Sequence, residues 1–185
     1  MVDVLKYGDK AHLQNGYNSW QGGYLDTNGH ADCGGNKYNV STADSPTRAP
    51  GTGTWEITSV TGKAVGAEVL SGDVIYLRNL YSEGTYLDTC GHADCGGNKY
   101  LVSTSPAKDR AVGTGRWRVF AESSSPTDSQ VREGDLVHLL NGYDDWNGGF
   151  LDTCGAGPAG GKYGVSTSAY IDRGEGTGTW KFSKA

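Results

Sequence analysis

The sequence predicts an all-β fold of twelve short strands, on three observations. Thirty of the 185 residues are glycine, and they separate short runs rich in β-branched and aromatic residues. Apolar and polar residues alternate within those runs, as in strands with one buried face. The same set of runs occurs three times along the chain, with no convincing helical periodicity between them. We therefore expect four strands in each third of the chain.

Three stretches of the sequence match almost position for position. They read GYLDTNGHADCGGNKYNVST from Gly23, TYLDTCGHADCGGNKYLVST from Thr85 and GFLDTCGAGPAGGKYGVST from Gly149. Each copy closes with Gly-Thr-Gly-X-Trp, and a period of this length is typical of structural repeats. We expect one domain over residues 1–185, with repeats at about 5–60, 69–121 and 131–183. The linkers would be Thr61 to Glu68 and Glu122 to Gln130.

In the first copy the expected strands are Lys10 to Gln14, Gly23 to Thr27, Lys37 to Thr42 and Thr54 to Thr58. Alternation places one side chain of every two on the buried face. The expected core positions are Ala11, Leu13, Leu25, Tyr38, Val40, Trp55 and Ile57 in the first copy, Ile75, Leu77, Leu87, Tyr100, Val102, Trp117 and Val119 in the second, and Val137, Leu139, Leu151, Tyr163, Val165, Trp180 and Phe182 in the third.

Composition narrows the classes of partner. The net charge is −5 and the isoelectric point is near 5.3, which argues against a nucleic acid because such binding relies on clustered Lys and Arg. The sequence has no apolar stretch long enough to cross a membrane and no charged and apolar leader after Met1. We expect a protein that is cytoplasmic or released without a signal peptide.

The four cysteines do not follow the threefold pattern. Cys90 and Cys95 occur together only in the second copy, where they could close a small loop, and Cys33 and Cys154 stand singly in the other two. A disulfide framework for each copy would need a pair in all three. Small, buried or half-buried thiols in a reducing compartment are the favoured interpretation. A zinc site is disfavoured because the third copy lacks His and Asp there.

Three copies of a four-stranded unit, each ending in a Trp, resemble a β-trefoil with pseudo-threefold symmetry. That fold has six strands in a barrel and three hairpins that cap it. The ricin-type branch carries Gln-X-Trp, which is missing at Trp55, Trp117 and Trp180. The run YLDTCG…KYLVSTS…W is closer to the fascin-like and the bacterial or fungal lectin-like trefoils. The resemblance covers the whole chain and implies a sugar-binding function.

Candidate ligand-binding residues are polar or aromatic, recur between the copies and are expected to face away from the core. The carboxylates, amides and amines among them would form hydrogen bonds with sugar hydroxyls, and the aromatic rings would stack on the apolar side of a sugar ring. The set comprises Asn15, Tyr17, Trp20, Asp26, Lys37, Asn79, Tyr81, Asp88, Lys99, Asn141, Tyr143, Trp146, Asp152 and Lys162.

Trp20 and Trp146 are the expected stacking platforms. Each lies in a loop of Gly, Asn, Ser or Asp residues with no obvious core to enter. The second copy is two residues shorter there and lacks the Trp, so its site would be weak or missing. The alternative is that both Trp side chains cover the rim of the barrel.

Structural roles compete for several of the other polar residues. Asp26 and its copies precede a turn, where an Asp often caps backbone N–H groups. Asp9, Asp73 and Asp135 are expected to form turns. Arg48, Arg110 and Arg173 are expected to pair with a carboxylate or to bind loop carbonyls.

The sequence predicts a carbohydrate-binding lectin with two or three sugar sites, one per repeat, and not an enzyme. It shows no nucleophile elbow or phosphate loop, and neither a cofactor nor a metal is expected. The partners would be glycans, with galactose-type and N-acetylated sugars both compatible with the resemblance, bound by a monomer or homodimer without nucleic acid or membrane insertion. The alternatives are a fascin-like protein that binds actin and a trefoil protease inhibitor.

Overall fold

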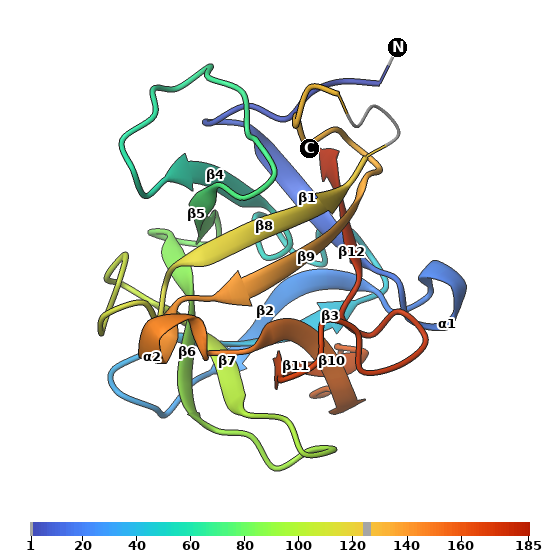
Figure 1. Ribbon diagram of the computed structural model, residues 1–185. Helices are drawn as coiled ribbons and strands as arrows, with labels where there is room; N and C mark the ends of the chain where they lie inside the picture. The colour runs from blue at the N-terminus through green and yellow to red at the C-terminus, as the bar shows by residue number, and fades with distance from the viewer. Residues whose placement is uncertain (1, 124–126) are drawn as a thin grey trace.

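The computed structural model describes residues 2–123 and 127–185 and contains twelve strands and two single helical turns (Figure 1). The predicted strands are confirmed within a few residues at each end. The two turns, α1 and α2, occupy loops in which no helix was expected. The elements are β1 (Lys10–Asn15), α1 (Tyr17–Trp20), β2 (Tyr24–His30), β3 (Tyr38–Ala43), β4 (Trp55–Ser59), β5 (Val74–Asn79), β6 (Thr85–His92), β7 (Tyr100–Ser105), β8 (Trp117–Glu122), β9 (Leu136–Asn141), α2 (Tyr143–Trp146), β10 (Phe150–Ala156), β11 (Tyr163–Ser168) and β12 (Trp180–Lys184).

All twelve strands belong to one antiparallel sheet that closes on itself. Strand β1 pairs with β4 and β12, β5 with β4 and β8, and β9 with β8 and β12. The hairpins β2–β3, β6–β7 and β10–β11 continue from these strands, and β3, β7 and β11 pair with one another. In Figure 1 the three hairpins lie in the lower half of the molecule and the other strands in the upper half.

The prediction of a β-trefoil is wrong, although the all-β class is correct. The trefoil prediction treated three hairpins as a cap separate from a barrel, whereas the hairpins are hydrogen-bonded into the same sheet as the other strands. The molecule is a closed antiparallel β-barrel built from twelve strands. The expectation that the three sequence copies form three structural repeats is also wrong. The fourth strand of each sequence copy forms its longest pairing with the first strand of the next copy, as in β4–β5 and β8–β9, so the copies do not fold as separate units.

The barrel interior is filled by the aliphatic and tryptophan positions that alternation predicts. Trp55, Trp117 and Trp180 are completely buried, and each indole N–H donates to the backbone carbonyl oxygen of Leu25, Leu87 or Leu151 at 2.9 to 3.0 Å. A buried indole needs such an acceptor. The expected core positions are buried except for Tyr38, Tyr100 and Tyr163, which are half-buried and face three surface cavities.

The cysteines form two disulfides, so their interpretation as free thiols is wrong. Cys33 pairs with Cys90, and Cys95 pairs with Cys154. Each bridge joins a loop of one sequence copy to a strand of the next, which explains why no copy carries a complete pair. Cys90 and Cys95 are not bonded to each other. The third junction has a hydrogen bond instead, from Asn28 Nδ2 to the carbonyl oxygen of Ala159 at 3.1 Å.

The expected linkers differ in how well they are described. Thr61 to Glu68 is a loop that returns to the barrel through an isolated bridge between Lys6 and Glu68. Glu122 to Gln130 includes residues 124–126, which lie outside the described part of the chain.

Candidate functional site

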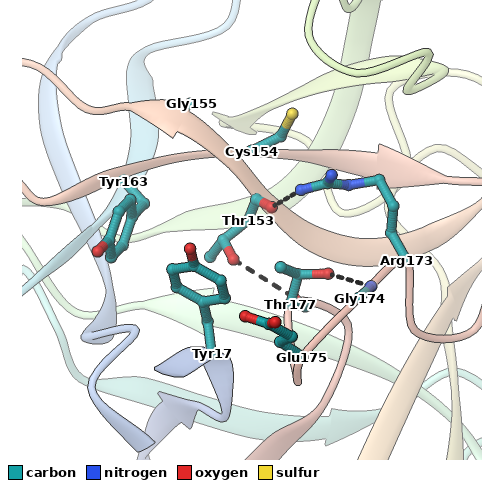
Figure 2. A pocket seen from close by; sticks show the side chains of 9 residues that line it. All are labelled: Tyr17, Thr153, Cys154, Gly155, Tyr163, Arg173, Gly174, Glu175 and Thr177. Carbon is teal, nitrogen blue, oxygen red and sulfur yellow. Dashed lines mark hydrogen bonds between the residues drawn. The ribbon is translucent and has the colours of Figure 1, made fainter. Parts of the chain in front are cut away.

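Three surface cavities lie at equivalent places around the barrel, each between a hairpin, the loop that follows it and a tyrosine from the adjacent copy. Their volumes are about 220, 230 and 470 Å³, in the order of the chain. We call them the first, second and third cavities, after the copy that supplies the hairpin. The first is lined by Thr27, Gly29, His30, Tyr38, Arg48, Ala49, Thr52 and Tyr81; the second by Thr89, Cys90, Gly91, His92, Tyr100, Arg110, Ala111, Thr114 and Tyr143; and the third by Thr153, Cys154, Gly155, Tyr163, Arg173, Gly174, Glu175, Thr177 and Tyr17 (Figure 2).

A pair of tyrosine rings forms one wall of each cavity. The rings meet edge to face, with centroid separations of 5.3 Å for Tyr38–Tyr81, 5.3 Å for Tyr100–Tyr143 and 5.4 Å for Tyr163–Tyr17. This arrangement is favourable because the positive edge of one ring faces the negative face of the other. It fixes two phenol rings and their hydroxyls at the cavity.

A buried ion pair supports the opposite wall of the third cavity. Arg173 donates from Nε to Asp152 Oδ2 at 3.2 Å and from Nη2 to the carbonyl oxygen of Thr153 at 3.0 Å (Figure 2 shows the second bond). The Asp152 side chain is completely buried, whereas about 30% of the Arg173 side chain is exposed. Arg48–Asp26 and Arg110–Asp88 repeat the geometry in the other two cavities. The prediction that these arginines pair with a carboxylate or bind loop carbonyls is confirmed.

A buried asparagine ties the parts of each cavity together. In the third cavity Asn15 Oδ1 accepts from the backbone N–H of Tyr17 at 3.0 Å and from Thr153 Oγ1 at 3.2 Å. Its Nδ2 donates to the carbonyl oxygen of Thr177 at 2.9 Å. Asn79 and Asn141 make the corresponding bonds in the first and second cavities. One amide therefore sets the positions of three lining residues at once.

The expectation that these aspartates and asparagines face away from the core is wrong. Asp26, Asp88, Asp152, Asn15, Asn79 and Asn141 have no exposed surface. A fully buried Asp is rare unless it is paired, and the arginines supply the partner. In this structure the six residues support the cavity walls from behind.

The pKa of the Tyr100 hydroxyl in the second cavity is raised. Burial is the main cause, and electrostatic interactions with Tyr143 and Asp144 add to it. The phenol is protonated at physiological pH, as an ordinary tyrosine is, and can donate a hydrogen bond.

The predicted stacking residues lie next to the cavities rather than in them. Trp20 ends α1, which also carries Tyr17, and Trp146 ends α2, which carries Tyr143. The Lys181 Nζ atom lies 4.2 Å from the Trp20 ring centroid, and Arg118 Cζ lies 4.2 Å from that of Trp146. One face of each indole is thus covered by a cation.

The predicted lysines lie at the surface and bind groups of the protein itself. Lys37 Nζ pairs with Glu83 at 3.1 Å, and Lys162 Nζ pairs with Asp44 at 2.8 Å. Lys99 Nζ donates to the carbonyl oxygen of Asn147. Of the predicted ligand-binding set, only Tyr17, Tyr81 and Tyr143 line a cavity. The binding roles of the whole set remain predictions.

Strand alternation assigned Tyr38, Tyr100 and Tyr163 to the core, so they were not among the predicted ligand-binding residues. A usable signal was present. The other repeated positions on that face are aliphatic or tryptophan, whereas a tyrosine carries a hydroxyl that must reach a partner or water.

Within residues 2–123 and 127–185, no group of three or more His, Cys, Asp or Glu side chains is arranged to hold a metal ion. No helix in that part of the chain has the length and apolar character needed to cross a membrane.

Comparison with known proteins shows what the fold resembles. No protein-family model matches the chain, and no curated protein sequence matches it. The SDF2-like protein from Arabidopsis thaliana has a similar structure, with a TM-score of 0.75 and 16% identity over 98% of this chain and 95% of that chain. A Caenorhabditis elegans protein of unknown function has a TM-score of 0.76 and 16% identity over 98% and 97%.

A third similar structure is the Saccharomyces cerevisiae protein O-mannosyltransferase Pmt1–Pmt2 complex bound to the sugar donor. The TM-score is 0.72 and the identity 16%, with 99% of this chain aligned to 25% of that chain. Similarity at this level of identity shows the fold alone. No family model matches, and the similar structures include the SDF2-like protein and the C. elegans protein, so the predicted membership of a fascin-like or bacterial and fungal trefoil lectin branch is wrong.

Proposed function

We propose that this chain is a binding protein whose three tyrosine-walled cavities each take part of a carbohydrate. The observation that carries the proposal is the edge-to-face tyrosine pair that recurs beside an arginine and threonine wall in all three cavities.

The chemistry of the walls matches that of a sugar. A sugar ring has an apolar face of C–H groups and a rim of hydroxyls, so it needs one aromatic surface and a few fixed polar groups. Tyr163 and Tyr17 supply aromatic surface and two hydroxyls in the third cavity, and Thr153 and Thr177 lie on the opposite wall. These side chains are already held by Asn15 and Arg173, so little ordering is needed on binding.

The volumes fit small ligands. Small-molecule sites commonly occupy about 300 to 1,000 Å³, and the third cavity, at about 470 Å³, falls in that range. The first and second cavities are about half as large and would hold a single ring or its edge. Weak sites of this kind gain strength when several engage one branched glycan.

The structural neighbours are compatible with a role close to glycosylated proteins. The yeast protein O-mannosyltransferase complex, part of which shares this fold, was solved with a sugar donor bound.

The test is binding of the labelled protein to a broad glycan array, with one variant that removes the three tyrosines contributed by adjacent copies, Tyr17→Ala, Tyr81→Ala and Tyr143→Ala. The matched control is Tyr170→Ala, because Tyr170 is 70% exposed and does not line a cavity. We expect sugar-specific binding that the triple variant loses and the control keeps. A folded wild-type protein that binds no glycan would contradict the proposal and favour a protein partner.

The disulfides also indicate the redox environment in which the protein folds. Stable disulfides form in oxidising environments and are rare in the cytosol. We therefore infer that Cys33–Cys90 and Cys95–Cys154 form in an oxidising compartment or outside the cell, in place of the reducing compartment expected from the sequence. Mass spectrometry of the purified native protein without reductant would check both pairings.

A further inference from the structure

We propose that the third cavity selects saccharides that carry a free, protonated amino group. The inference rests on the proposed function and adds a ligand class for one of the three cavities. The first and second cavities of the same chain serve as internal references, because they share its architecture but have no carboxylate among their lining residues.

The third cavity is larger than the other two because two of its side chains are smaller than their counterparts. Ala156 stands where the other copies have His30 and His92, and Gly174 stands where they have Ala49 and Ala111. The cavity volume is about 470 Å³, compared with about 220 and 230 Å³ in the other two. The extra room accepts a whole sugar ring with a substituent.

Alanine in place of histidine also leaves part of the Tyr163 ring uncovered. In the first cavity the His30 ring lies over Tyr38 with centroids 5.9 Å apart and an interplanar angle of 32°. In the second cavity His92 lies over Tyr100 at 5.7 Å and 31°. No imidazole occupies this place against Tyr163, whose neighbour there is the methyl group of Ala156. A ligand ring can therefore take the position that histidine holds elsewhere.

A carboxylate is added to the third cavity. Glu175 stands where the other copies have Pro50 and Val112. Among residues 2–123 and 127–185, no hydrogen bond or ion pair joins the Glu175 carboxylate to another side chain. Arg173, a cation in the cavity wall, is already paired with the buried Asp152. The charge of Glu175 is thus available to a ligand.

The loop that carries Glu175 holds a second carboxylate, Asp172, outside the lining of the cavity. Asp172 binds the backbone N–H groups of Gly176 and Gly178, each at 3.1 Å. In the second copy the corresponding Asp109 is neutralised by Arg116 at 2.9 Å, whereas the third copy has Thr179 in place of that arginine. The first copy has Thr47 in place of the aspartate. Asp172 thus adds an unpaired negative charge to the loop that carries Glu175, while Glu175 is the carboxylate among the lining residues of the third cavity.

The position of Glu175 is fixed by its own turn. Its backbone is left-handed, with φ of 51°, and the next residue, Gly176, approaches the neighbouring copy so closely that a Cβ there would lie 2.4 Å from the carbonyl oxygen of Gly16. The turn thus lies against the backbone that carries Tyr17. Figure 2 shows the Glu175 and Tyr17 side chains on the same side of the cavity, with Tyr163 beyond Tyr17.

These features fit an amino sugar. Its ammonium group would donate to the Glu175 carboxylate, the C–H face of its ring would lie on Tyr163, and its hydroxyls would reach the Tyr17 hydroxyl. An ammonium group near a phenol ring is also attracted by the ring quadrupole. An N-acetylated sugar has no charge at this position and a bulkier substituent, so it would lose the ion pair.

The experiment is calorimetric titration of the intact protein with a glucosamine oligosaccharide and with the N-acetylglucosamine oligosaccharide of the same length, at mildly acidic pH, where a primary amine is charged. The test variant is Glu175→Gln. The matched control is Glu83→Gln, which removes an exposed carboxylate near Tyr81 that is paired with Lys37. A lysine-containing peptide is the third ligand, and thermal unfolding confirms that both variants are folded.

We expect the wild type to bind the free-amino oligosaccharide about tenfold more tightly than the N-acetylated one, the range of a charge-assisted hydrogen bond. Glu175→Gln should remove that preference without changing the affinity for the N-acetylated form, and Glu83→Gln should change neither. Equal binding of the two saccharides, or a preference that Glu175→Gln leaves intact, would overturn the inference and leave the proposed function standing. Failure of both saccharides to bind would count against the proposed function as well. Equal binding of the peptide would show that the sugar ring is not recognised.

Discussion

Asn36 donates a hydrogen bond from Nδ2 to Asp88 Oδ2 at 2.9 Å, although the two residues are 52 positions apart. Asn98 makes the same bond to Asp152 at 2.8 Å. Each asparagine also donates to a serine hydroxyl, Ser103 or Ser166. These bonds connect the hairpin loop of one copy to the cavity wall of the next. The third junction lacks the bond, because Gly161 occupies the asparagine position, and it also lacks a disulfide.

Replacing Gly161 by Asn should stabilise the protein. The new amide would donate to Asp26 and to Ser41, whose hydroxyl is buried without a partner among the described residues. A Cβ at Gly161 would lie 3.1 Å from Ser41 Oγ, a contact that rotation of the serine relieves, and 3.2 Å from the backbone carbonyl oxygen of Pro158, so the loop must also shift slightly. Hydrogen bonds to charged groups contribute about 1.5 to 3 kcal/mol, so we expect a gain of about 1 kcal/mol in urea unfolding. Asn36→Gly is the reverse change and should cost at least as much. Loss of stability in Gly161→Asn would contradict this account.

Removing the Cys33–Cys90 disulfide should lower stability strongly. The bridge spans 57 residues, and cross-linking a loop of that length stabilises the folded state by about 4 kcal/mol through the entropy of the unfolded chain. The variant Cys33→Ser, Cys90→Ser, compared with the wild type by urea unfolding without reductant, measures the effect. Adding reductant to the wild type should bring its stability below that of this variant, because Cys95–Cys154 opens as well. No response to reductant would show that the bridges are absent.

Stability should depend on pH through Asp73 and Tyr7. Burial tends to raise the pKa of Asp73, but bonds from Lys63, the backbone N–H of Leu70 and Tyr7 outweigh it and lower the pKa. A lowered carboxylate pKa stabilises the fold above the unfolded value of about 3.9, and the benefit is lost as pH falls below it. Burial, with the bond to Asp73, raises the pKa of Tyr7, which costs stability as pH rises past about 10.

Unfolding free energies measured across pH check both effects. Asp73→Asn should flatten the acid limb of the curve, and Tyr7→Phe should flatten the alkaline limb. Equal slopes in variant and wild type would rule out these groups as the cause.

The prediction that Asp9, Asp73 and Asp135 form turns is confirmed. Each carboxylate accepts a hydrogen bond from the backbone N–H three residues earlier, that of Lys6, Leu70 or Arg132.

Replacing Trp146 by Ala should lower sugar affinity while leaving the melting temperature nearly unchanged. Trp146 shares α2 with Tyr143, so its loss loosens the turn that brings Tyr143 to the second cavity. The indole is only half-buried and stacks on Arg118, so little core packing is lost. Glycan binding and thermal unfolding of the same preparation provide the check. An unfolded variant, or one with full binding, would count against the prediction.

The sequence was sufficient to predict the strands and the filling of the barrel because both depend on local information. Alternation, glycine turns and the Trp at the start of β4, β8 and β12 act within a few residues. The buried ion pairs were harder to place. Asp26 binds an arginine 22 positions later, and Asp88 also binds an asparagine of the preceding copy. Judged only from the adjacent residues in the sequence, an Asp before a turn is predicted to be an exposed side chain that caps backbone N–H groups.

The disulfides and the architecture were mispredicted for a common reason. If each copy were a unit, its cysteine pairs and strand partners would lie inside it. Four cysteines allow three pairings, and the two bridges found both cross between copies. Likewise β4 and β8 form their longest ladders with the first strand of the following copy. Contacts of this kind require the three-dimensional arrangement.

The pairing of β1 with β12 over five positions has a consequence for how the chain assembles. These are the first and last strands of the barrel in chain order, so the ring stays open until β12 has emerged from the ribosome. Before that, both disulfides can already form, since all four cysteines lie between the two strands. The contact between the third and first copies has no covalent bridge, so hydrogen bonds such as Asn28 Nδ2 to the carbonyl oxygen of Ala159, together with the β1–β12 ladder, complete the circle.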